Sequence, residues 1–144
     1  MSNILTLDIV TQEKRLLTAP VKSVTVDTVE GEITILPGHV PLLTRLSEGL
    51  LRFTDEKGTE DVVAIFGGFL EVGDDGKLTI LADSAIRASD IDEAKVKAAQ
   101  AAAQEALKDK SRQVEFAEAE ASLRKAYVEL KALNKGAKPR HSTN

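Results

Sequence analysis

The chain has 144 residues, about the size of one ordinary domain or of a smaller compact domain with an appendage. It contains no cysteine, which excludes disulfides, thiolate nucleophiles and cysteine-ligated metal sites. The formal net charge is −4, with residues 1–89 at −6 and residues 90–144 at +2, so we expect no nucleic-acid partner, and only the rear segment has the charge to approach an acidic surface.

The first ten residues, MSNILTLDIV, lack the basic region, apolar stretch and small-residue cleavage site of a signal peptide. The chain also has no run of about 18 apolar residues, the length that a membrane-spanning helix requires. We therefore expect a protein of the cytosol, or of an equivalent compartment, that does not insert into a membrane.

Residues 1–88 have the alternating pattern of short, half-buried strands separated by turn residues. The candidate strands are ILTLDIV, VKSVTVDT, EITIL, LLRFTD, EDVVAIF, FLEV and KLTILAD. Glycine, proline and aspartate stand at the joints between them. Roughly eight to ten short strands in this length indicate an antiparallel sandwich or a flattened barrel.

Two glycine-containing stretches of this region are candidates for chemistry. GEITILPGHVPLLTRL places Pro37, Gly38, His39 and Pro41 between two apolar runs, which indicates either a catalytic loop around His39 or a rigid turn at an interface. No serine elbow or second metal ligand accompanies the histidine, so we favour the rigid turn. FGGFLEV lacks the pattern of a phosphate loop, and Gly67–Gly68 is predicted to permit a bend or bulge in a strand.

After residue 88 the alternation gives way to alanine-rich helical sequence. Ser89 or Asp90 is a candidate cap for a first helix, and its inner face is expected to be formed by Ile91, Ala94, Ala98 and Ala101 or Ala102. Ser111 is a candidate cap for a second helix, with a seam of Phe116, Ala119, Leu123, Ala126, Leu130 and Leu133. The two helices are predicted to form an antiparallel hairpin joined near residues 109–111.

The predicted fold is therefore α+β. It has a β-sandwich at residues 1–88, a helical hairpin at 89–135 and a disordered tail at 136–144. Alanine buries little apolar surface, so the first helix would hold a neighbour weakly and the hairpin could detach; a permanently docked hairpin is the alternative. The residues alone give no enzyme, cofactor or metal signal, and this design is that of an adaptor.

The sequence resembles the epsilon subunit of bacterial F-type ATP synthase, which corresponds to delta in mitochondria. The motifs that carry the resemblance are GEITI at 31–35, PGHVPLL at 37–43 and GGFLEV at 67–72, together with LTILADSAIRASDID and the helical end. It covers residues 4–133 in the right order. It implies a ten-stranded β-sandwich with a helical hairpin, in a non-catalytic rotor subunit of the central stalk.

The resemblance also implies partners and contact residues. The sandwich would contact gamma along a side and the ring of c subunits through Thr28, Glu30, Gly31, Glu32 and the nearby His39. The hairpin would extend to the catalytic alpha and beta subunits and restrain ATP hydrolysis. The cations expected to meet an acidic loop of beta are Lys108, Lys110, Arg112, Arg124 and Lys125. The location implied is peripheral, on the cytoplasmic side of the coupling membrane.

Some members of this family bind ATP through an Ile/Leu-Asp-x-x-Arg-Ala motif, which appears here as Ile91-Asp92-Glu93-Ala94-Lys95-Val96. Lysine lacks the bidentate fork of arginine, and Glu129 stands where another cation would help. A site at Asp92, Lys95 and Lys125 is therefore expected to bind ATP weakly or not at all. The alternative to a rotor subunit is a free-standing β-sandwich that binds a ligand, although a carbohydrate-binding face would normally expose aromatic side chains.

Overall fold

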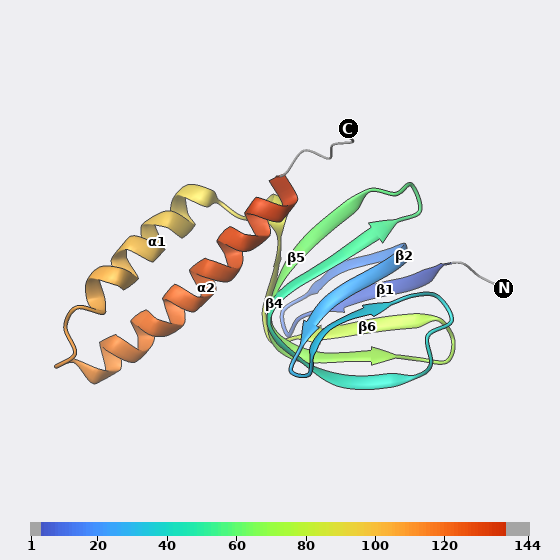
Figure 1. Cartoon of the computed structure of the whole chain (residues 1–144), viewed down its shortest axis with the longest axis horizontal. Helices are drawn as coiled ribbons and strands as arrows, with labels where there is room; N and C mark the ends of the chain where they lie inside the picture. The colour runs from blue at the N-terminus through green and yellow to red at the C-terminus, as the bar shows by residue number, and fades with distance from the viewer. Residues whose placement is uncertain (1–3, 138–144) are drawn as a thin grey trace. The chain divides into compact units, whose positions relative to one another are not determined.

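The computed structural model describes residues 4–137, and the chain divides into two compact units between Arg87 and Ala88 (Figure 1). In the described residues 4–87, the regular structure of the first unit consists of β-strands alone. The second unit contains two helices that follow a short 3₁₀ turn.

Seven strands form the described part of the first unit. Their bounds are β1 (Leu5–Val10), β2 (Arg15–Thr28), β3 (Gly31–Ile35), β4 (Leu42–Asp55), β5 (Glu60–Val72), β6 (Lys77–Ala82) and β7 (Ala85–Arg87). All pairings are antiparallel except that of β1 with β6. The pairing order β1-β6-β5-β4-β2 closes on itself because β1 also pairs with β2, so the unit is a flattened barrel.

The three long strands each contribute to both layers of this barrel. The first half of β2 pairs with β1, whereas its second half pairs with β3 and β4. Likewise, β5 pairs with β7 near its start and with β6 near its end. The sequence pattern divides the long strands into shorter ones, so it predicts about ten strands where the structure has seven. The predicted antiparallel sandwich is confirmed, with the strand count as an approximation.

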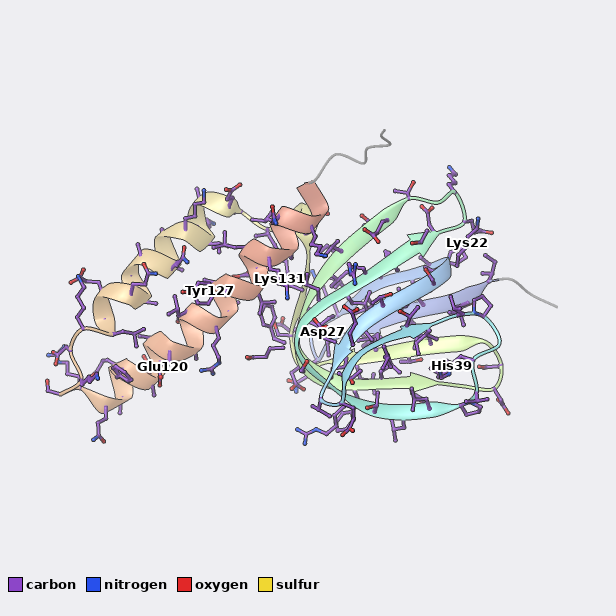
Figure 2. The ribbon with its side chains drawn as sticks, viewed as in Figure 1. Lys22, Asp27, His39, Glu120, Tyr127 and Lys131 are labelled. Atoms are coloured by element: carbon purple, nitrogen blue, oxygen red, sulfur yellow. The ribbon has the colours of Figure 1, made fainter. Side chains whose placement is uncertain are left out.

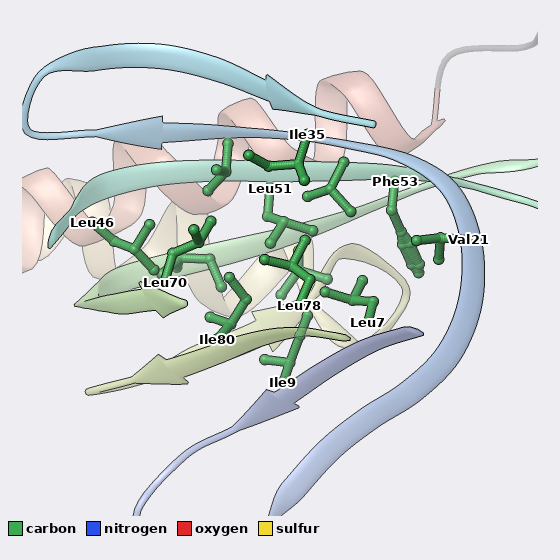
Figure 3. Close-up of a cluster of buried hydrophobic side chains, with 14 of the residues drawn as sticks. Leu7, Ile9, Val21, Ile35, Leu46, Leu51, Phe53, Leu70, Leu78 and Ile80 are labelled. Carbon is green, nitrogen blue, oxygen red and sulfur yellow. The ribbon is translucent and has the colours of Figure 1, made fainter. Parts of the chain in front are cut away.

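The core lies between the two layers and consists mainly of aliphatic side chains from every strand except β7 (Figure 3). Leu7 and Ile9 of β1, Leu51 of β4 and Leu78 and Ile80 of β6 are essentially inaccessible to solvent. The pairs in β1 and β6 occupy alternate positions, which is the periodicity that places one face of a strand inward.

Gly67 and Gly68 form the corner at which β5 passes from one layer to the other. Their φ angles are +87° and +128°, a region that other residues rarely adopt. A side chain on Gly68 would also overlap the carbonyl oxygen of Leu81. The bend predicted for this glycine pair is confirmed.

The second unit is an antiparallel hairpin (Figure 1). A 3₁₀ turn (Ala88–Asp90) precedes α1 (Glu93–Ala106), and residues 107–112 lead to α2 (Gln113–Ala137). The seam predicted on α2 has the expected burial: Ala119 and Ala126 are buried, and Phe116, Leu123, Leu130 and Leu133 are half-buried.

Several details of the helical prediction were wrong. Asp92, rather than Ser89 or Asp90, caps α1, because its carboxylate accepts the amide hydrogens of Ala94 and Lys95 at 3.1 and 3.3 Å. Ser111 does not cap α2, since its hydroxyl and amide both bond to Asp109.

The predicted inner face of the first helix was correct for Ile91 but wrong for its alanines. Ala94, Ala98, Ala101 and Ala102 are exposed, whereas Ile91, Val96 and Ala103 are buried. Alanines occupy an arc of about 200° on this helix, wider than the buried face, so the sequence pattern does not select which of them face inward.

The disordered tail was predicted to begin at residue 136, but α2 continues through Gly136 and Ala137. Residues 138–144, which include His141, lie outside the described part of the chain.

Replacing Gly68 by alanine is expected to destabilise the β unit by about 2–4 kcal/mol, because the new methyl group meets backbone at a strained φ. Gly58 is the matched control: its φ is +86°, but no atom lies within 4 Å of the position that an added methyl group would take, so Gly58→Ala should cost only about 1–2 kcal/mol. Urea unfolding of the full chain measures both. Equal losses for the two variants would contradict the steric argument.

Candidate functional site

The turn between β2 and β3 is held by the side chain of Thr28. The Thr28 hydroxyl donates to the carbonyl oxygen of Gly31 at 2.6 Å and accepts the amide hydrogen of Glu30 at 3.1 Å. Thr28 is 5% exposed, so it shapes the turn from within. Val29, Glu30 and Gly31 are exposed and form the surface of the turn. Of the predicted contact residues here, Thr28 has a supporting rather than an exposed position.

Glu32 follows the turn and already has an intramolecular partner. Its carboxylate lies 3.1 Å from the Arg52 guanidinium on β4, in an ion pair on the outer surface of the barrel. An exposed pair of this kind contributes about 0–1 kcal/mol, so it fixes the direction of the side chain more than it stabilises the fold.

The structure does not bring His39 to this turn. The turn precedes β3 and His39 follows it, and five extended residues separate the two places by about 16 Å. Figure 2 shows His39 well apart from Asp27 at the root of the turn. The His39 ring bonds through Nδ1 to the carbonyl oxygen of Val40 at 2.6 Å. The prediction that His39 lies near the turn was wrong. The strand EITIL was predicted between them, but its length was not carried into the placement of His39.

A row of outward side chains, which the sequence pattern did not reveal, crosses the β4–β5–β6 face. In the strand register Arg45 stands opposite Phe69, and Phe69 stands opposite Leu81. Phe69 and Leu81 are 47% and 52% exposed, and Leu43, two residues before Arg45, is 69% exposed. The Arg45 guanidinium lies 6.0 Å from the centroid of the Phe69 ring. These four residues form the apolar face of the β unit.

The signal for this face was present in the sequence as apolar residues at positions out of phase with the core. In β5 the core residues are Leu70 and Val72, so Phe69 must point outward. In β6 the same phase places Leu81 outward beside the core residues Ile80 and Ala82. Assigning the phase requires knowledge of which residues reach the core, and a short apolar run does not give it.

The loop between the helices is organised by Asp109. Its carboxylate accepts both the hydroxyl and the amide hydrogen of Ser111, and these hydrogen bonds hold the pKa of Asp109 below its ordinary value. Lys108 pairs with Glu105 at 3.3 Å. Lys108, Lys110 and Arg112 are all exposed in or beside this loop and form the basic loop.

The five predicted cations of the hairpin do not form one patch. Arg124 and Lys125 lie on α2, twelve or more residues beyond Arg112, which corresponds to about 18 Å along a helix. The sequence analysis grouped these cations by charge alone. The length of α2 separates them into the basic loop and a second group, Arg124 and Lys125.

The three residues predicted for an ATP site, Asp92, Lys95 and Lys125, lie near one level of the hairpin. Nearby carboxylates make this place unfavourable for a phosphate group. The antiparallel arrangement brings the first turn of α1, which contains Lys95, to the level of the middle of α2, where Lys125 and Glu129 lie. Asp92 places a carboxylate on the N-terminal amides of α1, the groups that would otherwise attract a phosphate.

A shallow groove of about 360 Å³ lies between the two helices and is lined mainly by alanine, with Glu115 and Glu118 at its rim. Within residues 4–137, no group of three or more histidine or carboxylate side chains is arranged to hold a metal ion. None of the helices in that same range has the length and apolar character to cross a membrane.

Two family models cover nearly the whole chain. Residues 4–88 match the model described as ATP synthase, Delta/Epsilon chain, beta-sandwich domain, and residues 89–134 match the long alpha-helix domain of the same chains. Among individual proteins, the chain is 42% identical to ATP synthase epsilon chain 2 of Ralstonia nicotianae over 95% of this chain and 98% of that one. It is 39% identical to the ATP synthase epsilon chain of Nitrosomonas eutropha, over 98% and 100%.

Solved structures give the same match. A chain in the structure of the Euglena gracilis mitochondrial ATP synthase, OSCP/F1/c-ring, superimposes with a TM-score of 0.71 at 27% identity, covering 96% of this chain and 84% of that one. A chain in the central stalk/c-ring structure of the Tetrahymena thermophila mitochondrial enzyme superimposes with a TM-score of 0.56 at 18% identity, covering 90% and 96%, and that likeness concerns the fold alone.

Proposed function

Because the chain belongs to the delta/epsilon chain family of ATP synthases, as an epsilon subunit, we propose that it is a non-catalytic part of the rotating central stalk. In this role it joins gamma to the ring of c subunits and so couples ion flow to ATP synthesis. The observation that carries the proposal is the apolar face of the β unit, which offers a partner subunit a docking surface.

The apolar face has the composition of the centre of a protein interface. Phe69 and Leu81 offer a contiguous apolar area, and Arg45 adds a cation beside the ring. Aromatic residues and arginine are enriched where binding energy concentrates, and charged groups at the rim set orientation. We assign gamma to this face because the family places gamma along a side of the sandwich.

The turn formed by Thr28–Gly31 is the part assigned to the ring of c subunits. Val29 and Glu30 are exposed there, and the Thr28 hydroxyl holds the backbone that presents them. Glu32 contributes less to this contact, because its carboxylate pairs with Arg52. His39 is reassigned away from the ring, since it lies at the other end of β3.

The hairpin is the part assigned to the catalytic alpha and beta subunits, where it restrains ATP hydrolysis. The basic loop is its distal end, and three cations in five residues give it the charge to meet an acidic loop. At that end α1 and α2 meet across the alanine-lined groove. Because alanine buries little apolar area, the two helices pack weakly against each other there. ATP is not a required ligand in this proposal.

The subunit then lies at the surface of the coupling membrane, on its cytoplasmic side, as a peripheral component. The free-standing ligand-binding module remains the alternative. It is disfavoured because the exposed aromatic side chain on the apolar face stands beside leucines and an arginine, the composition of a protein interface.

The apolar face is tested by the double variant Phe69→Glu/Leu81→Glu. Two carboxylates in place of the apolar side chains should weaken binding to purified gamma by about thirtyfold or more, because charge must then be desolvated at the interface. The melting temperature should stay near that of the wild type, because Phe69 and Leu81 are about half exposed. Isothermal titration of gamma into the full chain measures the affinity. Val114→Glu, an exposed apolar position on α2, is the matched control. Wild-type affinity in the double variant would exclude this face as the gamma site.

The hairpin is tested by ATP hydrolysis of the catalytic complex reconstituted with the full chain or with a chain that ends after Ala88. Removal of the hairpin should raise hydrolysis while the shortened subunit remains bound. In the full chain, Lys110→Glu/Arg112→Glu should release most of the same inhibition, whereas Lys131→Glu on α2 should not. Unchanged hydrolysis after truncation would mean that the hairpin does not inhibit under these conditions.

ATP binding by the full chain is expected to be undetectable at micromolar concentrations, because Asp92 neutralises the start of α1 and Lys95 offers a single point of contact. Isothermal titration calorimetry provides the measurement. Lys95→Arg restores the bidentate fork and should raise the affinity relative to the wild type. A micromolar dissociation constant for the unmodified chain would refute this expectation.

A further inference from the structure

The strand ladder between β2 and β4 is interrupted at the root of the Thr28–Gly31 turn. Val26 pairs with Leu51 and Thr28 pairs with Leu46, so one residue of β2, Asp27, faces four residues of β4. Such a bulge leaves backbone groups without their ladder partners and sharpens the local bend. An amide that loses its ladder bond in a half-buried place needs another acceptor.

The side chain of Asp27 supplies that acceptor. Its Oδ2 accepts the amide hydrogen of Leu50 at 2.9 Å, so the carboxylate takes the place of the missing ladder bond. Gly49 makes this approach feasible, because a side chain at that position would overlap the Asp27 carboxylate. The residue opposite Asp27 on β3 is Glu32, and its own carboxylate is directed to Arg52, which separates the two negative charges.

A second hydrogen bond holds the other side of the bulge. The amide of Val29 donates to the carbonyl oxygen of Arg45 at 3.1 Å. The turn therefore rests on β4 at two points, Leu50 after the bulge and Arg45 before it. Asp27 is half-buried, whereas Val29 and Glu30 are exposed. The carboxylate of Asp27 consequently acts on the direction of the turn rather than on a partner directly.

We propose that Asp27 is a positioning residue, whose hydrogen bond to the Leu50 amide sets the direction in which the Thr28–Gly31 turn is presented to the ring of c subunits. This inference rests on the proposed function, in which that turn contacts the ring. Without the carboxylate the root of the turn keeps the β2–β3 ladder, the Thr28 hydroxyl bonds and the Val29 bond, but it loses its contact with the Leu50 amide of β4. The exposed tip then samples a wider range of directions. Binding then loses the advantage of a preorganised contact.

The test compares Asp27→Asn and Asp27→Ala in the full chain bound to gamma. Asparagine keeps an oxygen that accepts the Leu50 hydrogen, so Asp27→Asn should bind the isolated ring like the wild type. Asp27→Ala should bind the ring about tenfold more weakly, with unchanged affinity for gamma and faster hydrogen exchange at Leu50. If Asp27→Ala does not fold, Asp27→Glu replaces it, since the extra methylene displaces the turn while an acceptor remains.

Several outcomes overturn the proposal. It fails if the alanine or glutamate variant binds the ring like the wild type, and it fails if Asp27→Asn is as defective as Asp27→Ala, because charge rather than geometry would then be responsible. The double variant Val29→Lys/Glu30→Lys changes the exposed tip directly. If that variant alone weakens ring binding, the ring contact stands and the role of Asp27 falls; if it and the Asp27 variants all bind normally, the ring contact itself is misassigned and the inference falls with it.

Discussion

The β unit depends on three strands that each serve both of its layers. A strand that changes layers must bend, and a regular ladder does not bend sharply without leaving backbone groups unpaired. At the corner of β5 the chain uses Gly67 and Gly68 with positive φ. At the corner of β4 it uses the Asp27 carboxylate over Gly49. The closed pairing of the barrel follows from these local solutions.

The surfaces assigned to partners follow from the same corners. The Thr28–Gly31 turn begins where β2 leaves the bulge with β4, and we propose that the Asp27 contact at this bulge sets its direction. The apolar face lies on the first half of β4, on the part of β5 that follows Gly67–Gly68, and on β6. There Arg45, Phe69 and Leu81 come into register. Rigid strands therefore carry one proposed contact surface, and a turn held by the buried Thr28 side chain carries the other.

The hairpin follows a different physical logic. Alanine gives α1 a high helix propensity and little surface to bury, so the helix forms without being held strongly at its distal end. The basic loop that follows α1 is organised locally, by hydrogen bonds from Ser111 to Asp109, and its cations are exposed to solvent. An element that keeps its secondary structure while its packing is weak suits a part that changes position, and this is the property the proposed inhibition requires.

The sequence by itself determined the order of elements, the antiparallel sandwich, the bend at Gly67–Gly68 and the α2 seam, because period and glycine placement are local signals. Only the tertiary structure decided which residues meet. It separated His39 from the turn by the length of β3, divided the hairpin cations into two groups, and brought Asp27 to the Leu50 amide, 23 residues away. Such contacts depend on register and on bulges, and neither is encoded within a short stretch of residues.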